Sequence, residues 1–227
     1  MLGLIVLLVL LDAERTGQRL GLYLGFRALW LFSKLLHGVR PRGPDPLPAS
    51  GPAILISNHT SPADPFFLQS VTPRVIAFLM AREYFDIRLL RPIFRLGNTI
   101  LVNRTGHDTA ATKAALRTLQ NGELIGIFPE GSIHLDRKTF GRAKPGAALL
   151  ALVTRVPVIP AFIDRPMRTN RLIEGIAVPC PTKVVFGRPI DLGRYYDRDH
   201  DAATLNEVTE LMMNAIAALR PTGNPRS

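Results

Sequence analysis

The stretch A-I-L-I-S-N-H-T-S-P-A-D-P, residues 53–65, decides how this chain can fold. Its first four residues are apolar without interruption and mostly branched, as expected of a strand that is buried on both faces. Strands of that kind belong to α/β sheets, which bind their ligands at the carboxyl ends of the strands. The stretch therefore places His59 at a ligand-binding edge and Asp64 at the start of the next helix.

His59 and Asp64 have the chemistry of a general base and its orienting carboxylate. A neutral imidazole can take a proton from an alcohol, and the carboxylate fixes the tautomer and stabilises the imidazolium that forms. Residues five apart do not share one face of a regular helix, so the pair has to bridge a loop and a helix start. A structural interpretation also fits, because Asp64 before Pro65 resembles an N-cap with proline at the first helical position. His59 would then bond a backbone carbonyl.

Beyond this stretch, strand-like and helix-like segments alternate along the chain. Alternation predicts an α/β fold whose central sheet, mainly parallel or mixed, is flanked by helices. The segment V-P-V-I-P at 156–160 carries two prolines, which a central strand tolerates poorly, so we expect an edge, a bulge or a site lining there. The other strands are predicted at 75–80, 99–102, 124–128 and 183–186, and helices at 84–96, 108–121, 145–153 and 205–219.

The amino terminus is apolar and basic. Residues 2–11 form an apolar run too short for the roughly 20 residues of a membrane span, and its flanks do not fit a cleaved signal. Residues 20–36 predict a second helix, which contains Trp30. These features predict two helices lying on a membrane surface within residues 1–39, followed by an α/β domain over residues 40–227. A helical hairpin packed on the protein's own core is the alternative.

The 227 residues carry a net charge of +10, which favours anionic partners such as phosphates, nucleic acid or an anionic lipid surface. Nucleic-acid binding would explain the charge but not the apolar amino terminus, and the sequence shows no recognition motif or aromatic stacking platform. The single cysteine, Cys180, excludes an internal disulfide and a thiolate metal cluster. We therefore expect a reducing, cytoplasmic-side environment, no metal and no cofactor. Asp197, Asp199 and Asp201 are interpreted as a solvated, helix-capping loop, with metal binding as the less favoured alternative.

Three further motifs follow the His59 stretch, each at the end of a predicted strand. They are G-N-T-I-L-V-N-R at 97–104, F-P-E-G-S at 128–132 and V-P-V-I-P at 156–160. A basic turn, R-A-K-P-G-A at 142–147, precedes one of the predicted helices. Together with N-H-x-S-x-x-D at 58–64, this ordered set resembles the glycerolipid acyltransferase family typified by 1-acylglycerol-3-phosphate acyltransferases, over about residues 40–190.

The resemblance implies transfer of an acyl group from a thioester to a glycerol hydroxyl. His59 would be the general base on the acceptor alcohol, and Asp64 would orient it. A thioester is electrophilic enough for direct attack, so no enzyme nucleophile is needed, in keeping with the lack of a G-x-S-x-G elbow. Backbone N–H groups near the motifs would stabilise the oxyanion.

On the acceptor side, the resemblance implies that Arg104 and Lys144 bind a phosphate. Glu130, Gly131 and Ser132 would shape the same site, with Glu130 bonding the glycerol hydroxyl or holding an arginine. Taken singly, Arg104 also fits a surface arginine, Glu130 a turn residue and Lys144 a solvated lysine. The sequence departs from the family pattern at Asn103, where Asp is common, and at Ile133, where Arg is usual. The second departure bears on the identity of the acceptor.

The sequence thus predicts a membrane-associated acyltransferase of phospholipid biosynthesis, which makes phosphatidate from 1-acylglycerol 3-phosphate. The donor would be acyl-CoA or acyl-carrier protein, and the partners would be a lysophospholipid and membrane lipids. We expect it on the cytoplasmic side of the cell membrane, as a monotopic or peripheral protein. Other acceptors stay open, namely glycerol 3-phosphate, another lysophospholipid or a lyso-aminolipid, and a basic nucleic-acid-binding protein is an alternative of a different class.

Overall fold

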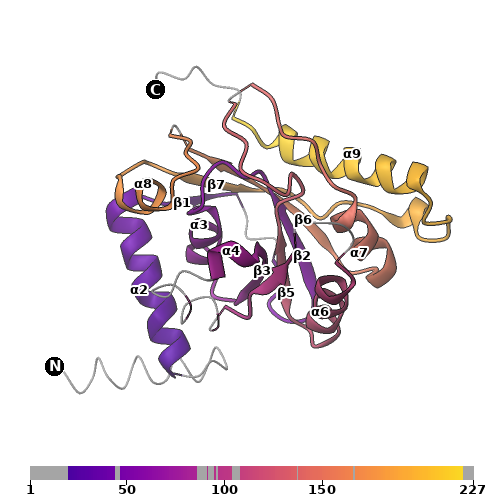
Figure 1. Cartoon of the computed structure of the whole chain (residues 1–227), viewed down its shortest axis with the longest axis horizontal. Coiled ribbons are helices and arrows are strands. Elements are labelled where there is room, and N and C mark those ends of the chain that lie inside the picture. The colour runs from indigo at the N-terminus through magenta and orange to yellow at the C-terminus, as the bar shows by residue number, and fades with distance from the viewer. Residues whose placement is uncertain are drawn as a thin grey trace.

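The structure is a computed structural model, and it describes residues 20–43, 47–85, 91, 95, 97–103, 108–136, 138–165 and 167–221. In this part of the chain a seven-stranded sheet has the order β1-β7-β6-β2-β5-β3-β4, with helices on both faces (Figure 1). The strands are β1 Arg40–Arg42, β2 Ala53–Ser57, β3 Ile76–Ala81, β4 Ile100–Val102, β5 Leu124–Ile127, β6 Val158–Asp164 and β7 Lys183–Phe186. The helices are α2 Leu20–His37, α3 Asp64–Ser70, α4 Arg82–Phe85, α6 Thr109–Gln120, α7 Gly146–Thr154, α8 Leu172–Ala177 and α9 Ala202–Ala218, with a 3-10 turn, η1, at Gly193–Tyr195.

The sheet is mixed, as predicted. Strands β6, β2, β5, β3 and β4 run parallel to one another, and β7 is antiparallel to β6. Because β6, β2 and β5 are adjacent and parallel, the loops that follow them all leave the sheet at the carboxyl ends of the strands. His59, Glu130 and Arg165 each follow one of these three strands. The candidate functional side chains gather at these carboxyl ends.

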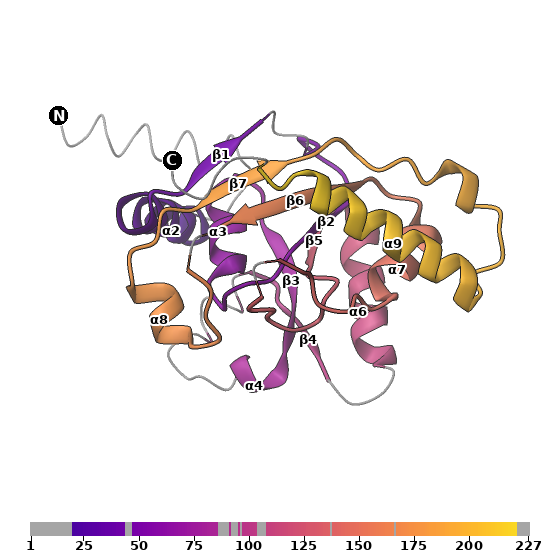
Figure 2. The same ribbon diagram turned by 90° about the horizontal axis from the view of Figure 1, so that it is seen from above.

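The central strand β2 is buried on both faces, as its continuous apolar run predicts. Ile54 and Ile56 pack into the core under α6, α7 and α9, whereas Ala53 and Leu55 pack into a second core that includes Phe67 of α3. Figure 2 shows the sheet lying between these two groups of helices. Full burial of one Leu or Ile side chain contributes about 1.5–3 kcal/mol, so a strand with two apolar faces is held strongly in the centre of the sheet.

Of the three alternatives for the segment at 156–160, the edge strand is wrong, and Pro157 precedes the strand. Strand β6 lies inside the sheet, between β7 and β2. Pro160 pairs with Ile56 in β2, and its carbonyl accepts the amide of Gly187, one residue past the end of β7. The N–H that proline lacks therefore faces a side where the neighbouring strand has already ended, and no ladder hydrogen bond is lost there.

The remaining elements agree with the sequence in type, with ends that differ by at most three residues. Helix α6 begins after Asp108, its N-cap, whose carboxylate accepts the Ala111 amide. Asp201 caps α9 in the same way, through the Thr204 amide, which confirms the capping interpretation of that loop. The sequence missed β1 and the short helix α8. The helix predicted over 84–96 is described only in part, because much of it lies outside the described residues.

The second amino-terminal helix is confirmed as α2, but the apolar run at 2–11 lies outside the described residues, so the expected helical pair is untested. In the part of the chain that the structure describes, no helix is both long and apolar enough to cross a membrane. Helix α2 packs beside α3 and is followed by β1, which pairs with β7. The division into residues 1–39 and 40–227 stays a prediction.

Candidate active site

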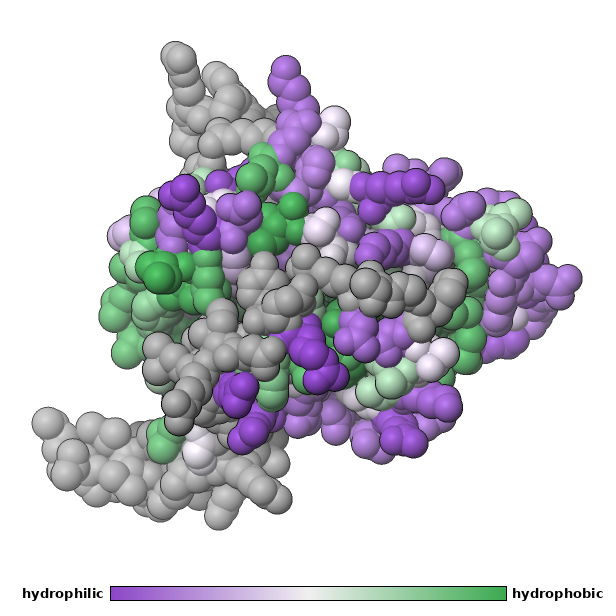
Figure 3. All heavy atoms as spheres, in the orientation of Figure 1, coloured by the Kyte–Doolittle hydropathy of each residue, from purple (hydrophilic) through white to green (hydrophobic). Residues whose placement is uncertain are grey.

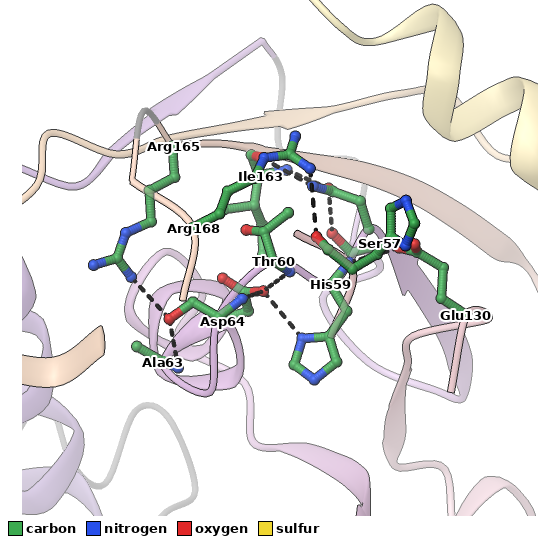
Figure 4. A network of polar contacts seen from close by, with 12 residues as sticks. Ser57, His59, Thr60, Ala63, Asp64, Glu130, Ile163, Arg165 and Arg168 are labelled. Atoms are coloured by element: carbon green, nitrogen blue, oxygen red, sulfur yellow. Dashed lines mark hydrogen bonds and ion pairs between the residues drawn. The ribbon is translucent and has the colours of Figure 1, made fainter. Parts of the chain in front are cut away.

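His59 and Asp64 face each other at the carboxyl edge of the sheet (Figure 4). The Nδ1 atom of His59 lies 3.0 Å from Oδ2 of Asp64. A carboxylate oxygen accepts, so Nδ1 carries the proton in this pair, and the second ring nitrogen, Nε2, is left as an acceptor. The Asp64 side chain is fully buried, whereas that of His59 is 17% exposed. The ring nitrogen that can accept a proton therefore belongs to a side chain that a substrate can reach.

The Asp64 carboxylate is turned back toward the loop that carries His59. Its Oδ2 atom also accepts the backbone amides of Thr60 and Ser61, at 2.6 and 2.8 Å. The helix N-cap is Ala63, and Asp64 is the first helical residue, so the capping interpretation of Asp64 is wrong. Three donors converge on one oxygen, which fixes the carboxylate in the orientation that holds the imidazole.

The flat face of the His59 ring is held by an aromatic stack. Phe128, the residue after β5, lies over the imidazole at a centroid distance of 4.1 Å and an angle of 15°. Phe78 of β3 stacks on Phe128 in turn, at 5.8 Å and 11°. Phe78 can occupy this place because its β5 neighbour is Gly126, where a Cβ atom would lie 2.3 Å from the Phe78 ring. The stack and the Asp64 hydrogen bond together restrict the orientation of His59.

Glu130 joins three segments of the site. Its Oε1 atom accepts the His59 amide at 2.9 Å, and its Oε2 atom accepts the Gly141 amide at 2.6 Å. The side chain is 4% exposed, and in the described part of the chain it meets these amides rather than an arginine. The sequence interpretation gave Glu130 a hydroxyl or an arginine as its partner, and the structure instead assigns it a contact with backbone amides. Its part in substrate binding stays a prediction.

The other predicted acceptor-site residues lie next to Glu130 where the structure describes them. Gly131 has a φ of +66°, which favours glycine, and the Lys144 side chain lies over it, 3.0 Å from where a Cβ would stand. The amide of Lys144 donates to the Pro129 carbonyl at 2.8 Å, which ties the basic turn to the loop after β5. Ser132 is exposed beside Gly131. Arg104 lies outside the described residues, so its phosphate contact stays a prediction.

The residue that follows Ser132 is Ile133, which is half-buried where the family pattern has arginine. An arginine from another strand end reaches the same loop, since Arg168 donates to the carbonyl oxygens of His134 and Asp136. The His134 amide donates to the His59 carbonyl at 2.8 Å. Arg168 therefore braces the loop that supports His59.

Sequence reasoning missed Arg165, which follows β6 and contacts the loop between His59 and Asp64. Its guanidinium donates to Ser61 Oγ at 3.1 Å and to the Gly175 carbonyl of α8 at 3.0 Å, and it lies over the Phe67 ring at 5.0 Å. The side chain is 5% exposed, and its Nε atom has no partner among the described residues. A charged residue directly after an apolar strand, at the ligand-binding end of the sheet, is the signal that could have revealed it.

Asn58, the first residue of the N-H-x-S-x-x-D motif, has a structural role. Its amide group exchanges two hydrogen bonds with the Ile163 backbone: Nδ2 donates to the carbonyl at 3.0 Å, and Oδ1 accepts the amide at 2.7 Å. These bonds continue the pairing of β2 with β6 for one residue beyond the strand. They fix where the chain turns into His59.

The arrangement can remove a proton from an alcohol that approaches the open side of His59. Among the described residues the hydrogen-bond partner of the imidazole is the Asp64 carboxylate rather than a serine or cysteine, an arrangement that suits direct attack by a substrate oxygen. Within the described residues, no group of three His, Cys, Asp or Glu side chains is arranged to hold a metal ion. An imidazole held in this way at the carboxyl ends of an α/β sheet is suited to general-base catalysis of group transfer to an alcohol or to water.

Comparison with known proteins gives the family. The acyltransferase family model matches residues 38–164, which include the His59 and Glu130 motifs. The 1-acyl-sn-glycerol-3-phosphate acyltransferase of Bacillus subtilis is 23% identical over 164 residues, which are 72% of this chain and 79% of that protein. The human 1-acyl-sn-glycerol-3-phosphate acyltransferase beta is 30% identical over 132 residues, 56% of this chain and 47% of that protein.

A solved structure shares the fold. The 1-acyl-sn-glycerophosphate acyltransferase PlsC of Thermotoga maritima matches with a TM-score of 0.64 and 21% identity, over 86% of this chain and 80% of that one. The chain belongs to the glycerolipid acyltransferase family and is an O-acyltransferase.

Proposed function

We propose that this protein transfers a fatty acyl group from acyl-CoA or acyl-carrier protein to the free hydroxyl of 1-acylglycerol 3-phosphate, giving phosphatidate. The observation that carries the proposal is the His59–Asp64 pair, whose hydrogen bond leaves Nε2 as the acceptor on a partly exposed ring. The names of the relatives support the choice of acceptor.

The mechanism follows from this geometry in two steps. In the first, the acceptor hydroxyl gives its proton to His59 Nε2 while its oxygen attacks the thioester carbonyl carbon, and Asp64 stabilises the imidazolium. In the second, the tetrahedral intermediate collapses, the C–S bond breaks, and the thiolate takes the proton from Nε2. The new ester and the free thiol leave, and His59 is neutral again.

Phosphate recognition falls to cations around the loop after β5. Lys144 lies over Gly131, and Arg104 follows β4, whose carboxyl end is at the same edge of the sheet as those of β2 and β5. Ile133 does not contribute the charge that the family's arginine would bring. We therefore assign the acceptor phosphate to Arg104 and Lys144. Glycerol 3-phosphate carries the same group and is the second candidate acceptor.

We place the protein on a membrane surface as a peripheral enzyme, on the cytoplasmic side. Helix α2 exposes Leu24, Trp30, Leu31, Phe32 and Leu35 to solvent, and Lys34 lies over the Trp30 ring at 4.7 Å. Apolar side chains beside an aromatic residue and a cation suit the boundary between lipid headgroups and acyl chains. Such a position brings the lipid acceptor to the enzyme without extracting it into water.

The test is a panel of acceptors with labelled acyl-CoA, applied to the parent protein and to His59→Ala. We expect transfer to 1-acylglycerol 3-phosphate to exceed transfer to the other acceptors, and His59→Ala to lower the rate by at least about a thousandfold, because the general base is lost. His200→Ala makes the same change at an exposed histidine before α9 and is expected to keep full activity. Full activity of His59→Ala would refute the mechanism, and preference for another acceptor would correct the substrate.

A further inference from the structure

Helix α8 exposes apolar side chains that do not pack into the core. Ile173 is 80% exposed, the highest exposure among the large apolar residues described, and Val178 at the end of the helix is 42% exposed. The opposite side of the helix is packed, with Gly175 buried. An isolated exposed Leu or Ile is ordinary on a protein surface, so the argument depends on what surrounds this one.

The exposed end of α8 continues the apolar surface of α2. Helix α8 lies near the carboxyl-terminal end of α2 (Figure 1), where the ring of His37, the last residue of α2, bonds the Ile176 carbonyl of α8 through Nε2 at 2.8 Å. Figure 3 shows apolar side chains gathered over both helices on one side of the molecule. We call the exposed apolar residues of the two helices the α2–α8 surface: Leu24, Trp30, Leu31, Phe32, Leu35, Ile173 and Val178.

Exposed cations lie on the segments that carry this surface. Lys34 is exposed on α2, Arg40 and Arg42 are exposed in β1, and Arg171 is exposed directly before α8. The acid of α8, Glu174, is half-buried and accepts a hydrogen bond from Thr169. An apolar centre with a cationic border complements an anionic lipid bilayer. A protein partner would need acidic groups in the same ring.

Helix α8 also packs against the loop between His59 and Asp64. A Cβ atom on Gly175 would lie 2.6 Å from Ser61 Oγ, so only glycine permits this approach. Arg165 donates to Ser61 Oγ and to the Gly175 carbonyl, and the Ser61 amide donates to the Asp64 carboxylate. The exposed end of α8 is thus separated from the catalytic pair by one buried arginine and one serine.

We propose that α8 is a second bilayer contact, provided by the catalytic domain itself, and that Ile173 enters the acyl-chain region beside α2. The proposal rests on the proposed lipid acceptor. With α2 and α8 both on the bilayer, the open side of His59 would be held close to the headgroups, where the acceptor hydroxyl lies. The amino-terminal helices would then bring the enzyme to the membrane, and α8 would set its orientation there.

Insertion is tested in the full chain with Ile173→Cys carrying an environment-sensitive fluorophore. Cys180 is 3% exposed, so the introduced thiol is the accessible one. Vesicles of equal parts phosphatidylcholine and phosphatidylglycerol should shift the emission to the blue. Val153→Cys on α7 is the matched control, since Val153 is 51% exposed on the side of the molecule away from α8, and it should show no shift. Absence of a shift at residue 173, or an equal shift at both sites, would overturn the proposal, whatever the amino-terminal helices do.

Function is tested with Ile173→Asp and Val153→Asp. Ile173→Asp should lower acylation of an acceptor embedded in vesicles by roughly ten- to hundredfold, the equivalent of losing one buried isoleucine. Activity toward a short-chain acceptor dissolved as monomers should stay within about twofold of the parent, which separates this proposal from failure of the proposed function. Val153→Asp should match the parent in both assays. Equal loss with the dissolved acceptor would overturn the proposal, as would a concentration-dependent dimer that Ile173→Asp abolishes, because a second copy would then cover the surface.

Discussion

At the scale of single residues, the site is held by buried polar atoms that meet only a few partners each. Asp64 is fully buried and binds the imidazole and two backbone amides through one oxygen. Arg165 approaches the same loop from the other side, through Ser61. A buried guanidinium is expensive to desolvate, and in the described part of the chain its partners are a hydroxyl, a carbonyl and an aromatic ring rather than a carboxylate. We interpret Arg165 as a positioning residue that holds Ser61, whose amide binds the Asp64 carboxylate.

Replacing Arg165 should therefore affect turnover more than binding. Arg165→Met keeps the aliphatic packing on Phe67 but loses both hydrogen bonds, so we expect kcat to fall roughly ten- to hundredfold while the KM for the acyl donor stays within about twofold. Arg165→Lys retains the charge and one donor and should recover part of kcat. Steady-state kinetics well below the melting temperature of each variant check this. A variant that loses folded protein but keeps its kcat would show that Arg165 serves stability alone.

At the scale of elements, a glycine in β5 allows the sheet to support the imidazole ring of His59. Gly126 leaves room for Phe78 of β3, and the Phe78–Phe128–His59 stack extends from that gap to the imidazole. Ile76 also borders the missing side chain, with its Cγ2 atom 2.8 Å from the place of a Cβ. A glycine in the interior of a strand is usually unfavourable, and here close packing above it explains its presence.

Gly126→Ala should destabilise the protein and disturb the site together. The added methyl has to displace the Phe78 ring, an overpacking change that typically lowers the free energy of unfolding by about 1–3 kcal/mol. Because Phe78 supports Phe128, we also expect a lower kcat. Urea unfolding and steady-state kinetics measure the two effects. Gly146→Ala is the control, since nothing lies within 4 Å of a Cβ at this first residue of α7, and it should be neutral or slightly stabilising.

At the scale of the whole molecule, His37 fastens helix α2 to the rest of the domain. Its ring is 1% exposed, packs edge-on against Phe32 and Phe67, and donates through Nε2 to the Ile176 carbonyl. Nδ1 is buried with no partner among the described residues. Burial lowers the pKa of His37 most, and the charge of Arg165 adds to that effect, whereas the backbone groups of Ile176 and Cys180 oppose it.

The sign of the resulting pH dependence follows from linkage. The folded chain holds His37 at a pKa below the ordinary value of 6.5, so the unfolded chain takes up the proton first as the pH falls. The contribution of His37 to stability is thus complete above pH 6.5 and is lost as the pH falls through the lowered pKa. We expect the free energy of unfolding to drop less between about pH 7.5 and pH 5.5 in His37→Gln than in the parent. Urea titrations at both pH values measure this, and equal drops in the two proteins would contradict it.

The sequence alone determined the fold class and the pairing of His59 with Asp64. A continuous apolar strand such as residues 53–56 can be satisfied only inside a sheet covered on both faces, and the loop after it then has to lie at the ligand-binding edge. His59, Asp64 and Glu130 could be found because each is close in sequence to the strand that places it. The capping of α6 and α9 was equally readable, because an N-cap depends on residues three positions apart.

Only the tertiary structure decided the rest. Pro160 is tolerated inside the sheet because β7 ends beside it. The sequence of a single strand does not specify the order of the strands in the sheet. Arg165 meets Ser61 across 104 positions in the chain, Glu130 meets the His59 amide across 71, and α8 comes to rest beside α2 across 139. Each of these contacts depends on which strands become neighbours, a choice made by the packing of the whole core, whereas local patterns extend over only a few residues.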